Sequence, residues 1–346
     1  MSNNEGQSGL KKTNRTEQSA IDVISEKPKS KLNALKRKKA IWAYIFLAPQ
    51  IIVFFVFSAY PIIMSYVYSL YDWNGIGPLK DFVGLDNYIQ LLSQPRFWNS
   101  FLVSIYYIIG TTILGVGFAL ILAIILNDSR LKGKGIYRTI YFLPVVTTTA
   151  IVGIIMGNIF GINGLVNEVL QTLNIINRPI TWLTDGTLAV TVLIIIGSWK
   201  GLGINMVYWL AGLQSIPSDL YESAQLDGAG FWKTLRHVTL PLLKPMFAVI
   251  ILLSLVGGIN AFDLVKTLTN GGPNFATETL DLFIYNYAFS SQLGGGSVRM
   301  GYASAAGVLL GIFTFIISMM FGAASFSKDI AKLRGDKKKS KGGVKA

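Results

Sequence analysis

The chain has 346 residues, of which 51% are hydrophobic and only 14% are charged, and its formal net charge is +13. Soluble domains average about 25% charged residues, so this composition excludes an ordinary soluble protein and indicates a membrane protein. Cysteine is absent and His237 is the single histidine, which excludes disulfides, thiol chemistry, His-cluster metal sites and catalysis by a Ser-His or Cys-His pair within this chain.

The first residues are polar. Residues 1–39 hold ten Lys and Arg residues and show no periodic apolar pattern, which predicts a disordered basic tail. No apolar h-region occurs in this stretch, so we expect no cleavable signal peptide. A membrane domain is predicted over residues 40–326, and a second basic tail over residues 327–346.

Six segments between the tails are long and apolar enough to cross a membrane, which takes about 20 residues of helix. The sequence therefore predicts an all-α membrane protein with six transmembrane helices. The predicted spans are Ala40–Leu70, Ser100–Leu126, Ile140–Phe160, Leu188–Leu213, Met246–Phe262 and Tyr302–Ser325.

The basic residues predict the orientation of these spans. Of the 31 Lys and Arg residues, 25 lie in the two tails, in the loop 127–139 and in the segment after the fourth span, whereas the other three loops hold five. Because cytoplasmic loops are rich in Lys and Arg, both termini are predicted to be cytoplasmic. The positive charge is then topological, with some attraction to membrane lipid headgroups. No basic patch is interleaved with stacking aromatics, so we expect no nucleic acid partner.

The segment between the fourth and fifth spans is charged and punctuated by glycine. Ser218 or Asp219 is placed to cap a short helix, and Gly228 interrupts it as a left-handed cap would. A second short helix follows, and Pro241 is predicted to end it. Apolar residues occur at helical spacing in both pieces: Leu220, Tyr221, Ala224, Phe231, Trp232 and Leu235. This pattern fits either an amphipathic helix resting on headgroups or a docking element for a cytoplasmic partner.

The segment 215–241 resembles the EAA loop of permease subunits of binding-protein-dependent ABC transporters. The pattern is Glu-Ala-Ala, three residues, Gly, nine residues, Ile, any residue and Leu-Pro. Two positions depart from it, Ser223 for Ala and Val238 for Ile. The matching positions are Glu222, Ser223, Ala224, Gly228, Leu240 and Pro241.

Further stretches are similar to the sugar branch of these permeases. They are "FVGLDNYIQLL", "YFLPVVTTTAIVGIIMGNIF" and "LTNGGPNFATETLDLFIYNYAF". The likeness covers residues 40–325 and is greatest to the first permease of a maltose-type oligosaccharide importer. This chain lacks the two extra N-terminal spans and the large external loop of the maltose member, so no role of that loop is carried over.

The resemblance implies a type I ABC importer permease in a bacterial cell (inner) membrane. It implies a heterodimer with a second six-span permease, a cytoplasmic ABC ATPase dimer that receives the EAA loop, and an extracellular solute-binding protein that delivers a carbohydrate. The sequence contains no Gly-x4-Gly-Lys-Ser/Thr phosphate loop. We therefore expect no ATPase site and no cofactor in this chain, with ATP bound by the partner.

Polar residues inside the spans are candidates for the translocation path. Lys200 lies in the middle of the fourth span, where a charge costs about 2.5–3.5 kcal/mol, so it is expected to face the bundle interior or water. It either contacts the solute, or it snorkels or pairs with Asp263. Asn205, Asn260 and Asp263 are the other candidates. Aromatic faces for a sugar would come from Trp199, Tyr208, Trp209 and Phe262.

Glycines surround Lys200 in the fourth span. Gly197, Gly201 and Gly203 are predicted to break the helix there, because broken helices at membrane depth line cavities.

Two other classes of protein remain open on the sequence. An ion-gradient-driven secondary transporter would carry acidic residues deep in its spans. A membrane-embedded enzyme would need a cluster of His, Asp, Glu or Cys at depth. The spans hold almost no carboxylates and no such cluster.

Overall fold

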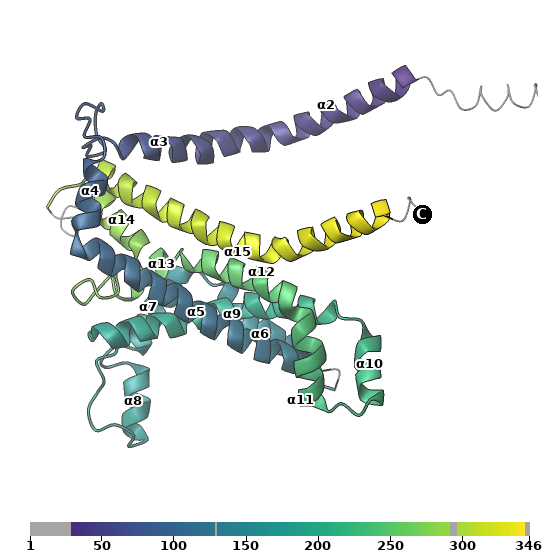
Figure 1. Cartoon of the computed structure of the whole chain (residues 1–346). Helices are drawn as coiled ribbons and strands as arrows, with labels where there is room; N and C mark the ends of the chain where they lie inside the picture. The colour runs from purple at the N-terminus through teal and green to yellow at the C-terminus, as the bar shows by residue number, and fades with distance from the viewer. Residues whose placement is uncertain (1–28, 129, 291–295, 343–346) are drawn as a thin grey trace, which may run out of the picture. The chain divides into compact units, whose positions relative to one another are not determined.

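The computed structural model describes residues 29–128, 130–290 and 296–342 and divides the chain into two units, Met1–Met64 and Ser65–Ala346 (Figure 1). The described residues are helical, and their only β pairing is an isolated bridge between Tyr71 and Phe82. Five helices are long and apolar enough to cross a membrane, or six if one bent pair counts as a single span. The coarse prediction of an all-α membrane fold is thus supported.

The first unit is built on one long helical stretch. It consists of α2 (Lys29–Phe54), the π-helix η1 (Phe55–Ala59) and the beginning of α3 (Tyr60–Tyr68). Residues 29–39 of the predicted tail belong to α2, where Leu, Ala, Lys and Arg in "KLNALKRKKA" favour a helix. Residues 1–28 of that tail lie outside the described residues.

Two long helices form the centre of the second unit. They are α5 (Pro95–Asn127) and α9 (Gly186–Gln214), and small and large apolar side chains interlock between them. Ala119 and Ala123 of α5 are fully buried, as is Trp209 of α9. The indole N–H of Trp209 donates a hydrogen bond to the carbonyl of Val116 at 3.1 Å, which fixes the two helices against each other. These two helices supply part of the wall of the candidate site.

The predicted third span is not one helix. It consists of α6 (Lys134–Val146) and α7 (Thr149–Ile159), which meet at a 98° bend. The span predicted at Ile140–Phe160 is therefore not one straight helix but falls on a bent pair of helices. Thr147 and Thr148 between the two helices have extended backbones with ψ of 137° and 130°. β-Branched residues tolerate this conformation well. The bend turns α7 onto α13 (Phe262–Leu268).

The segment after α9 begins with the separate helix α10 (Ser218–Leu226). From Phe231 onward it is helical without interruption into the fifth span. The helix α11 (Phe231–Thr234), the π-helix η2 (Leu235–Thr239) and α12 (Leu240–Gly258) form one continuous stretch. The prediction that Pro241 ends a helix is wrong. Pro241 occupies the first turn of α12, where a missing N–H is tolerated, and the preceding π-helix absorbs the irregular hydrogen bonding.

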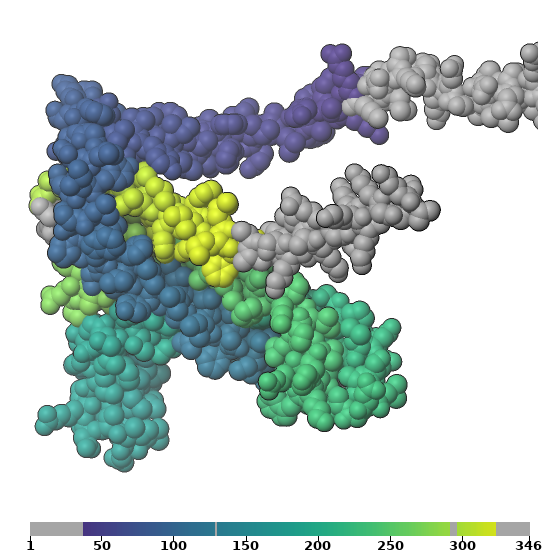
Figure 2. Space-filling view, in the orientation of Figure 1, coloured from purple at the N-terminus to yellow at the C-terminus, as the bar shows by residue number. Residues whose placement is uncertain are grey.

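Shorter helices complete the second unit. They are α4 (Asp86–Ser93), α8 (Leu165–Thr172), α13 and α14 (Leu280–Phe289), and they are followed by the long α15 (Met300–Gly342). The fifth span ends at Gly258 rather than Phe262, because the chain breaks before α13. α15 continues through most of the predicted C-terminal tail, and residues 343–346 lie outside the described residues. Figure 2 shows α8 and the α10–α11 segment as two separate projections of the second unit.

Candidate functional site

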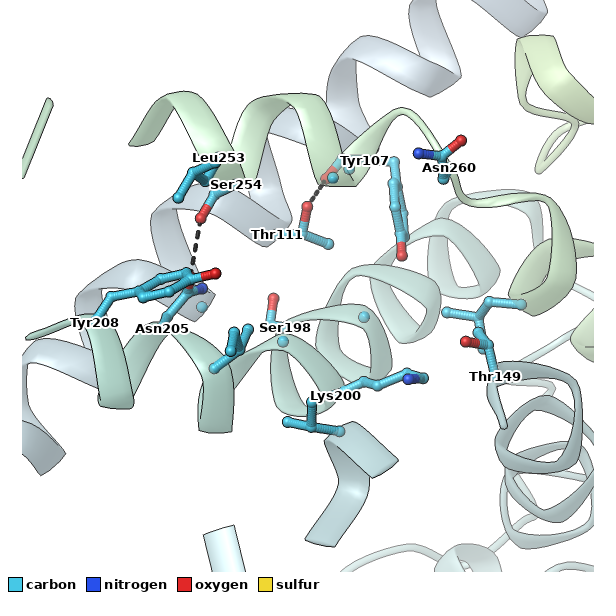
Figure 3. A pocket seen from close by; sticks show the side chains of 18 residues that line it. Tyr107, Thr111, Thr149, Ser198, Lys200, Asn205, Tyr208, Leu253, Ser254 and Asn260 are labelled. Carbon is cyan, nitrogen blue, oxygen red and sulfur yellow. Dashed lines mark hydrogen bonds between the residues drawn. The ribbon is translucent and has the colours of Figure 1, made fainter. Parts of the chain in front are cut away.

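A cavity of about 390 Å³ lies within the second unit, between α5, α9, α12 and the bend that joins α6 to α7 (Figure 3). All these walls come from helices that pack directly on one another. Hydroxyl and amide groups dominate its polar lining. The polar side chains that line it are Tyr107, Thr111, Thr149, Ser198, Lys200, Asn205, Tyr208, Ser254 and Asn260.

Asn205 is the most enclosed amide of this lining, with 7% of its surface exposed. Its carbonyl oxygen accepts a hydrogen bond from the hydroxyl of Ser254 on α12 at 3.1 Å, as Figure 3 shows. Its amide nitrogen, Nδ2, donates to no other residue in the described part of the chain. Because Asn205 lines the cavity and this donor is not used by the protein, the group can donate to a polar guest there.

Lys200 reaches into the cavity from the middle of α9 (Figure 3). Within the described residues it makes no hydrogen bond and no ion pair, although the charge of Asp263 acts on it. Asp263 itself is exposed in the first turn of α13 and does not line the cavity. The structure therefore brings together three of the four predicted path residues: Lys200, Asn205 and Asn260.

The predicted helix break around Lys200 does not occur, since α9 is continuous from Gly186 to Gln214. Two of the three glycines, Gly197 and Gly203, serve close packing instead. A Cβ at Gly197 would overlap the hydroxyl of Tyr107, and one at Gly203 would overlap the backbone carbonyl of Tyr141 in α6. The absence of side chains thus lets neighbouring helices approach α9 at the cavity.

The real break lies between α12 and α13, and Asn260 occupies it. Asp281 lies in the first turn of α14, which follows this break and α13. Its carboxylate accepts hydrogen bonds from the hydroxyl of Thr279 and from the backbone N–H of Leu282 at 2.8 Å. Burial raises the pKa of the Asp281 carboxyl, and these hydrogen bonds oppose that rise. Asp281 thereby stabilises the N-terminal turn of α14.

Of the four aromatic residues predicted to contact a sugar, only some lie at the cavity. Tyr208 lines the cavity, whereas Trp209 is 1% exposed in the helical core and Trp199 is 43% exposed on the surface. Phe262 packs against Tyr285, with ring centroids 4.8 Å apart. The lining residues of α5 and α12 were not predicted from the sequence. The one available signal was the spacing of four between Tyr107 and Thr111, which places two polar side chains on the same face of an apolar helix.

The segment that resembles the EAA loop rests on the helical core through one face of α10. Tyr221 packs on the core cluster around Trp209, and its hydroxyl accepts a hydrogen bond from Thr239 at 3.4 Å. The predicted caps are wrong, because Pro217 occupies the N-cap position and Ser218 and Asp219 fall in the first turn. Asp219 there still interacts favourably with the helix dipole.

Gly228 ends α10 as predicted, with a left-handed φ of +71°. The N–H of Gly228 donates to the carbonyl of Gln225 at 3.0 Å, and the N–H of Ala229 donates to that of Ala224 at 2.9 Å. These are the two bonds of a Schellman motif, which favours glycine at the left-handed position. The glycine turns the chain sharply from α10 into α11.

The outer face of this segment is exposed and mixed in character. Glu222 and Ser223 are exposed and make no ion pair within the described residues, and Leu240 and Pro241 are exposed at the start of α12. Three large apolar side chains are also exposed: Leu226 at 89%, Phe231 at 61% and Trp232 at 78%. Such an exposed apolar patch rimmed by polar residues is typical of an interaction site.

A metal site finds no support in the described part of the chain. No group of three or more His, Asp or Glu residues is placed there to hold an ion.

Comparison with known proteins gives a consistent result. Residues 115–331 match the family described as "Binding-protein-dependent transport system inner membrane component". The chain is 34% identical over 279 residues to the "Probable ABC transporter permease protein YurN" of Bacillus subtilis, covering 80% of this chain and 93% of that protein. It is 37% identical over 259 residues to the "Lactose transport system permease protein LacF" of Rhizobium radiobacter, covering 74% of this chain and 86% of that protein.

Two further similarities point the same way. The "Trehalose/maltose transport system permease protein MalF" of Thermococcus litoralis is 34% identical over 292 residues, covering 83% of this chain and 93% of that protein. A chain of a bacterial ABC transporter involved in the import of the acidic polysaccharide alginate has the same fold. Its TM-score is 0.72 at 24% identity, covering 85% of this chain and 98% of that chain. The resemblance drawn from segment 215–241 is confirmed: the chain belongs to the family of inner membrane components of binding-protein-dependent transport systems.

Proposed function

We propose that this chain is one of two permease subunits of an ATP-driven carbohydrate importer. The observation that carries the proposal is its similarity, at 34–37% identity, to permeases named for lactose and for trehalose and maltose. A solute with many hydroxyl groups would enter a cavity whose polar lining consists mainly of hydroxyl and amide groups. These groups can donate to and accept from sugar hydroxyls, with Lys200, Asn205 and Asn260 among them.

The membrane arrangement that supports this function has six spans and cytoplasmic termini. The helices α6 and α7 are long and apolar enough to cross a membrane only when they are taken together. Counted as one span, they bring the total to six. The excess of Lys and Arg in the two tails and in the loop 127–139 favours the cytoplasmic side for these three regions. Two spans separate the loop 127–139 from segment 215–241, which places that segment on the same side.

Coupling to ATP hydrolysis would take place at segment 215–241. Its exposed face offers Glu222, Ser223, Leu240 and Pro241 to a cytoplasmic ATPase dimer, and Gly228 sets the direction in which α11 leaves α10. A partner can shift a conformational equilibrium only through contacts that differ between the states. ATP would be bound by the ATPase alone, with no cofactor in this chain, and an external binding protein would deliver the carbohydrate to the two permeases.

The ion-gradient-driven alternative is not favoured. The curated relatives in the comparison are permease proteins of ABC or sugar transport systems, and the shared family depends on a binding protein by its own description. Lys200 is the charged side chain that lines the cavity, and no carboxylate lines it. An acidic residue at depth, which ion coupling would use, is therefore missing from this site.

The experiment that tests the proposal is purification of the chain from its own membrane. We expect a second permease and an ATPase to co-elute, with ATPase activity that rises when the binding protein carries a sugar. The double variant Glu222→Ala and Gly228→Pro should lose the ATPase, because proline cannot adopt the left-handed φ of Gly228.

The matched control is Glu168→Ala, which removes an exposed acidic residue of α8 on the predicted external side. It should retain the ATPase. Uptake of maltose, trehalose, lactose and arabinotriose by vesicles that contain the unaltered complex then identifies the solute. If no ATPase co-elutes and the double variant still transports, the proposed coupling is wrong.

A further inference from the structure

Five glycines line the cavity, and three of them are packed against protein atoms. A Cβ at Gly115 would lie 3.5 Å from the backbone oxygen of Ser198, and one at Gly258 would lie 3.4 Å from the backbone of Ile108. A Cβ at Gly197 would overlap the hydroxyl of Tyr107. At Gly197 the missing side chain allows α5 and α9 to approach one another, whereas at Gly115 and Gly258 a Cβ would make ordinary van der Waals contact with the neighbouring helix.

The other two glycines, Gly201 of α9 and Gly257 of α12, face empty space. A Cβ at Gly257 would meet no atom within 4 Å, and one at Gly201 would meet only the amide nitrogen of Asn205 at 4.0 Å. Both residues line the cavity. Helix packing therefore does not explain these glycines. Because these two residues have no side chains, the cavity is wider at their positions.

Asn205 supplies an independent reason to place a guest in that space. The side chain is 93% enclosed, since only 7% of the residue is exposed, and its carbonyl is already used by Ser254. Its Nδ2 donates to no other residue that the structure describes, and it lies beside the open side of Gly201. A side chain at position 201 would occupy the volume in front of this donor.

We propose that Gly201 and Gly257 are specificity-determining residues that set the upper size limit of the transported solute, which we infer to be an oligosaccharide. The inference rests on the proposed function, because it takes the cavity as part of the sugar path. Filling the space at either glycine reduces passage of long sugars before it reduces passage of short ones. A change of charge or of hydrogen bonding is not required for this effect.

The chain offers a direct test because it contains no cysteine. Single variants Gly201→Cys and Gly257→Cys are reconstituted in the full complex with its binding protein. They are modified with methyl or benzyl methanethiosulfonate, which add a small or a large group. Uptake of maltose, maltotriose and maltotetraose, and of arabino-oligosaccharides of matching length, is measured before and after modification.

The controls are Gly117→Cys and Gly311→Cys. Their added Cβ also meets no atom within 4 Å, but neither residue lines the cavity. We expect the benzyl adduct at position 201 or 257 to reduce tetrasaccharide uptake relative to disaccharide uptake by about tenfold or more. The methyl adduct should have a smaller effect, and the control adducts should leave the ratio unchanged.

The possible results decide between three conclusions. Equal loss for all sugar lengths, an unchanged ratio, or the same shift at a control position would overturn the size limit while leaving the proposed function intact. Loss of the second permease from the Gly257→Cys complex would overturn it too, because the residue would then pack on that partner. An unaltered complex that transports no sugar of either series contradicts the proposed function and, with it, the inference.

Discussion

A buried ion pair joins α5 to the loop before α14. Glu278 is 0% exposed, and its carboxylate accepts hydrogen bonds from Arg96 at 2.6 and 2.7 Å. Ser100 and Asn286 donate to the same carboxylate at 3.1 and 2.7 Å. The guanidinium of Arg96 also lies 3.6 Å from the ring centroid of Phe275. Such a pair adds little net stability, because the cost of removing both charges from water offsets their attraction. Removing one partner is nevertheless costly, because it leaves the other charge buried and unpaired.

The first prediction concerns this pair. Arg96→Ala should lower the free energy of unfolding by about 3–5 kcal/mol, since Glu278 would remain buried without its cation. Denaturant unfolding of the purified complex, followed by tryptophan fluorescence, measures the change. Arg178→Ala removes an exposed arginine and should stay within about 0.5 kcal/mol of the unaltered chain. Equal midpoints for the two variants would contradict the role of the pair.

Residue types in the sequence predicted some of this site and not the rest. Gly228 was predictable because a left-handed cap has a sequence signature. Lys200 was predictable because a charge in an apolar span needs a polar surrounding. Tyr107 and Ser254 were missed because a hydroxyl on an apolar helix is equally suited to a bond with its own backbone, as Ser198 makes with Ile194. Only the packing of α5, α9 and α12 shows which hydroxyl faces the cavity.

At the scale of secondary-structure elements, the close packing of α7 against α13 fixes the positions of both helices. Gly153 of α7 lies directly against α13, where a Cβ would overlap the hydroxyl of Thr267 and lie 3.4 Å from the carbonyl of Leu264. This approach holds the bend between α6 and α7, and α13 begins just after Asn260. The position of the cavity wall therefore depends on a contact that only glycine permits.

The second prediction tests that contact. Gly153→Ala should destabilise the second unit by about 1–3 kcal/mol, because the added methyl group forces α7 away from α13. Gly157→Ala is the matched control, since its Cβ would lie 3.8 Å from Leu268, which is ordinary contact. Thermal unfolding of both complexes measures the difference. The prediction fails if the midpoint of the Gly153 variant is at or above that of the Gly157 variant.

Element boundaries show why hydropathy alone was insufficient. The apolar content of residues 140–160 predicts a span, but a sum over a window does not register the extended pair Thr147 and Thr148. Pro241 suggested a helix end, yet the helix continues through it with the help of the π-helix η2. Gly197 and Gly203 of α9 suggested a break, yet neighbouring helices pack closely on them. In each case packing overrides a local preference.

At the scale of the whole molecule, α9 separates two projections of the second unit. The projection at α8 precedes α9 in the chain, and the α10–α11 segment follows it, so a membrane-spanning α9 places them on different sides of the membrane. The absence of cysteine from the sequence makes this arrangement measurable, because each introduced thiol is unique in the chain.

The third prediction uses four single variants, Ser19→Cys, Thr172→Cys, Ser218→Cys and Ser340→Cys. In intact spheroplasts a membrane-impermeant maleimide should label only Thr172→Cys, since α8 is predicted to be external and the other positions cytoplasmic. After the membrane is permeabilised, all four should react, which controls for accessibility. Labelling of Ser218→Cys and Ser340→Cys, with Ser19→Cys and Thr172→Cys protected, would mean five spans. In that case α6 and α7 would enter and leave the membrane on one side, and the cavity wall they form would be a re-entrant loop.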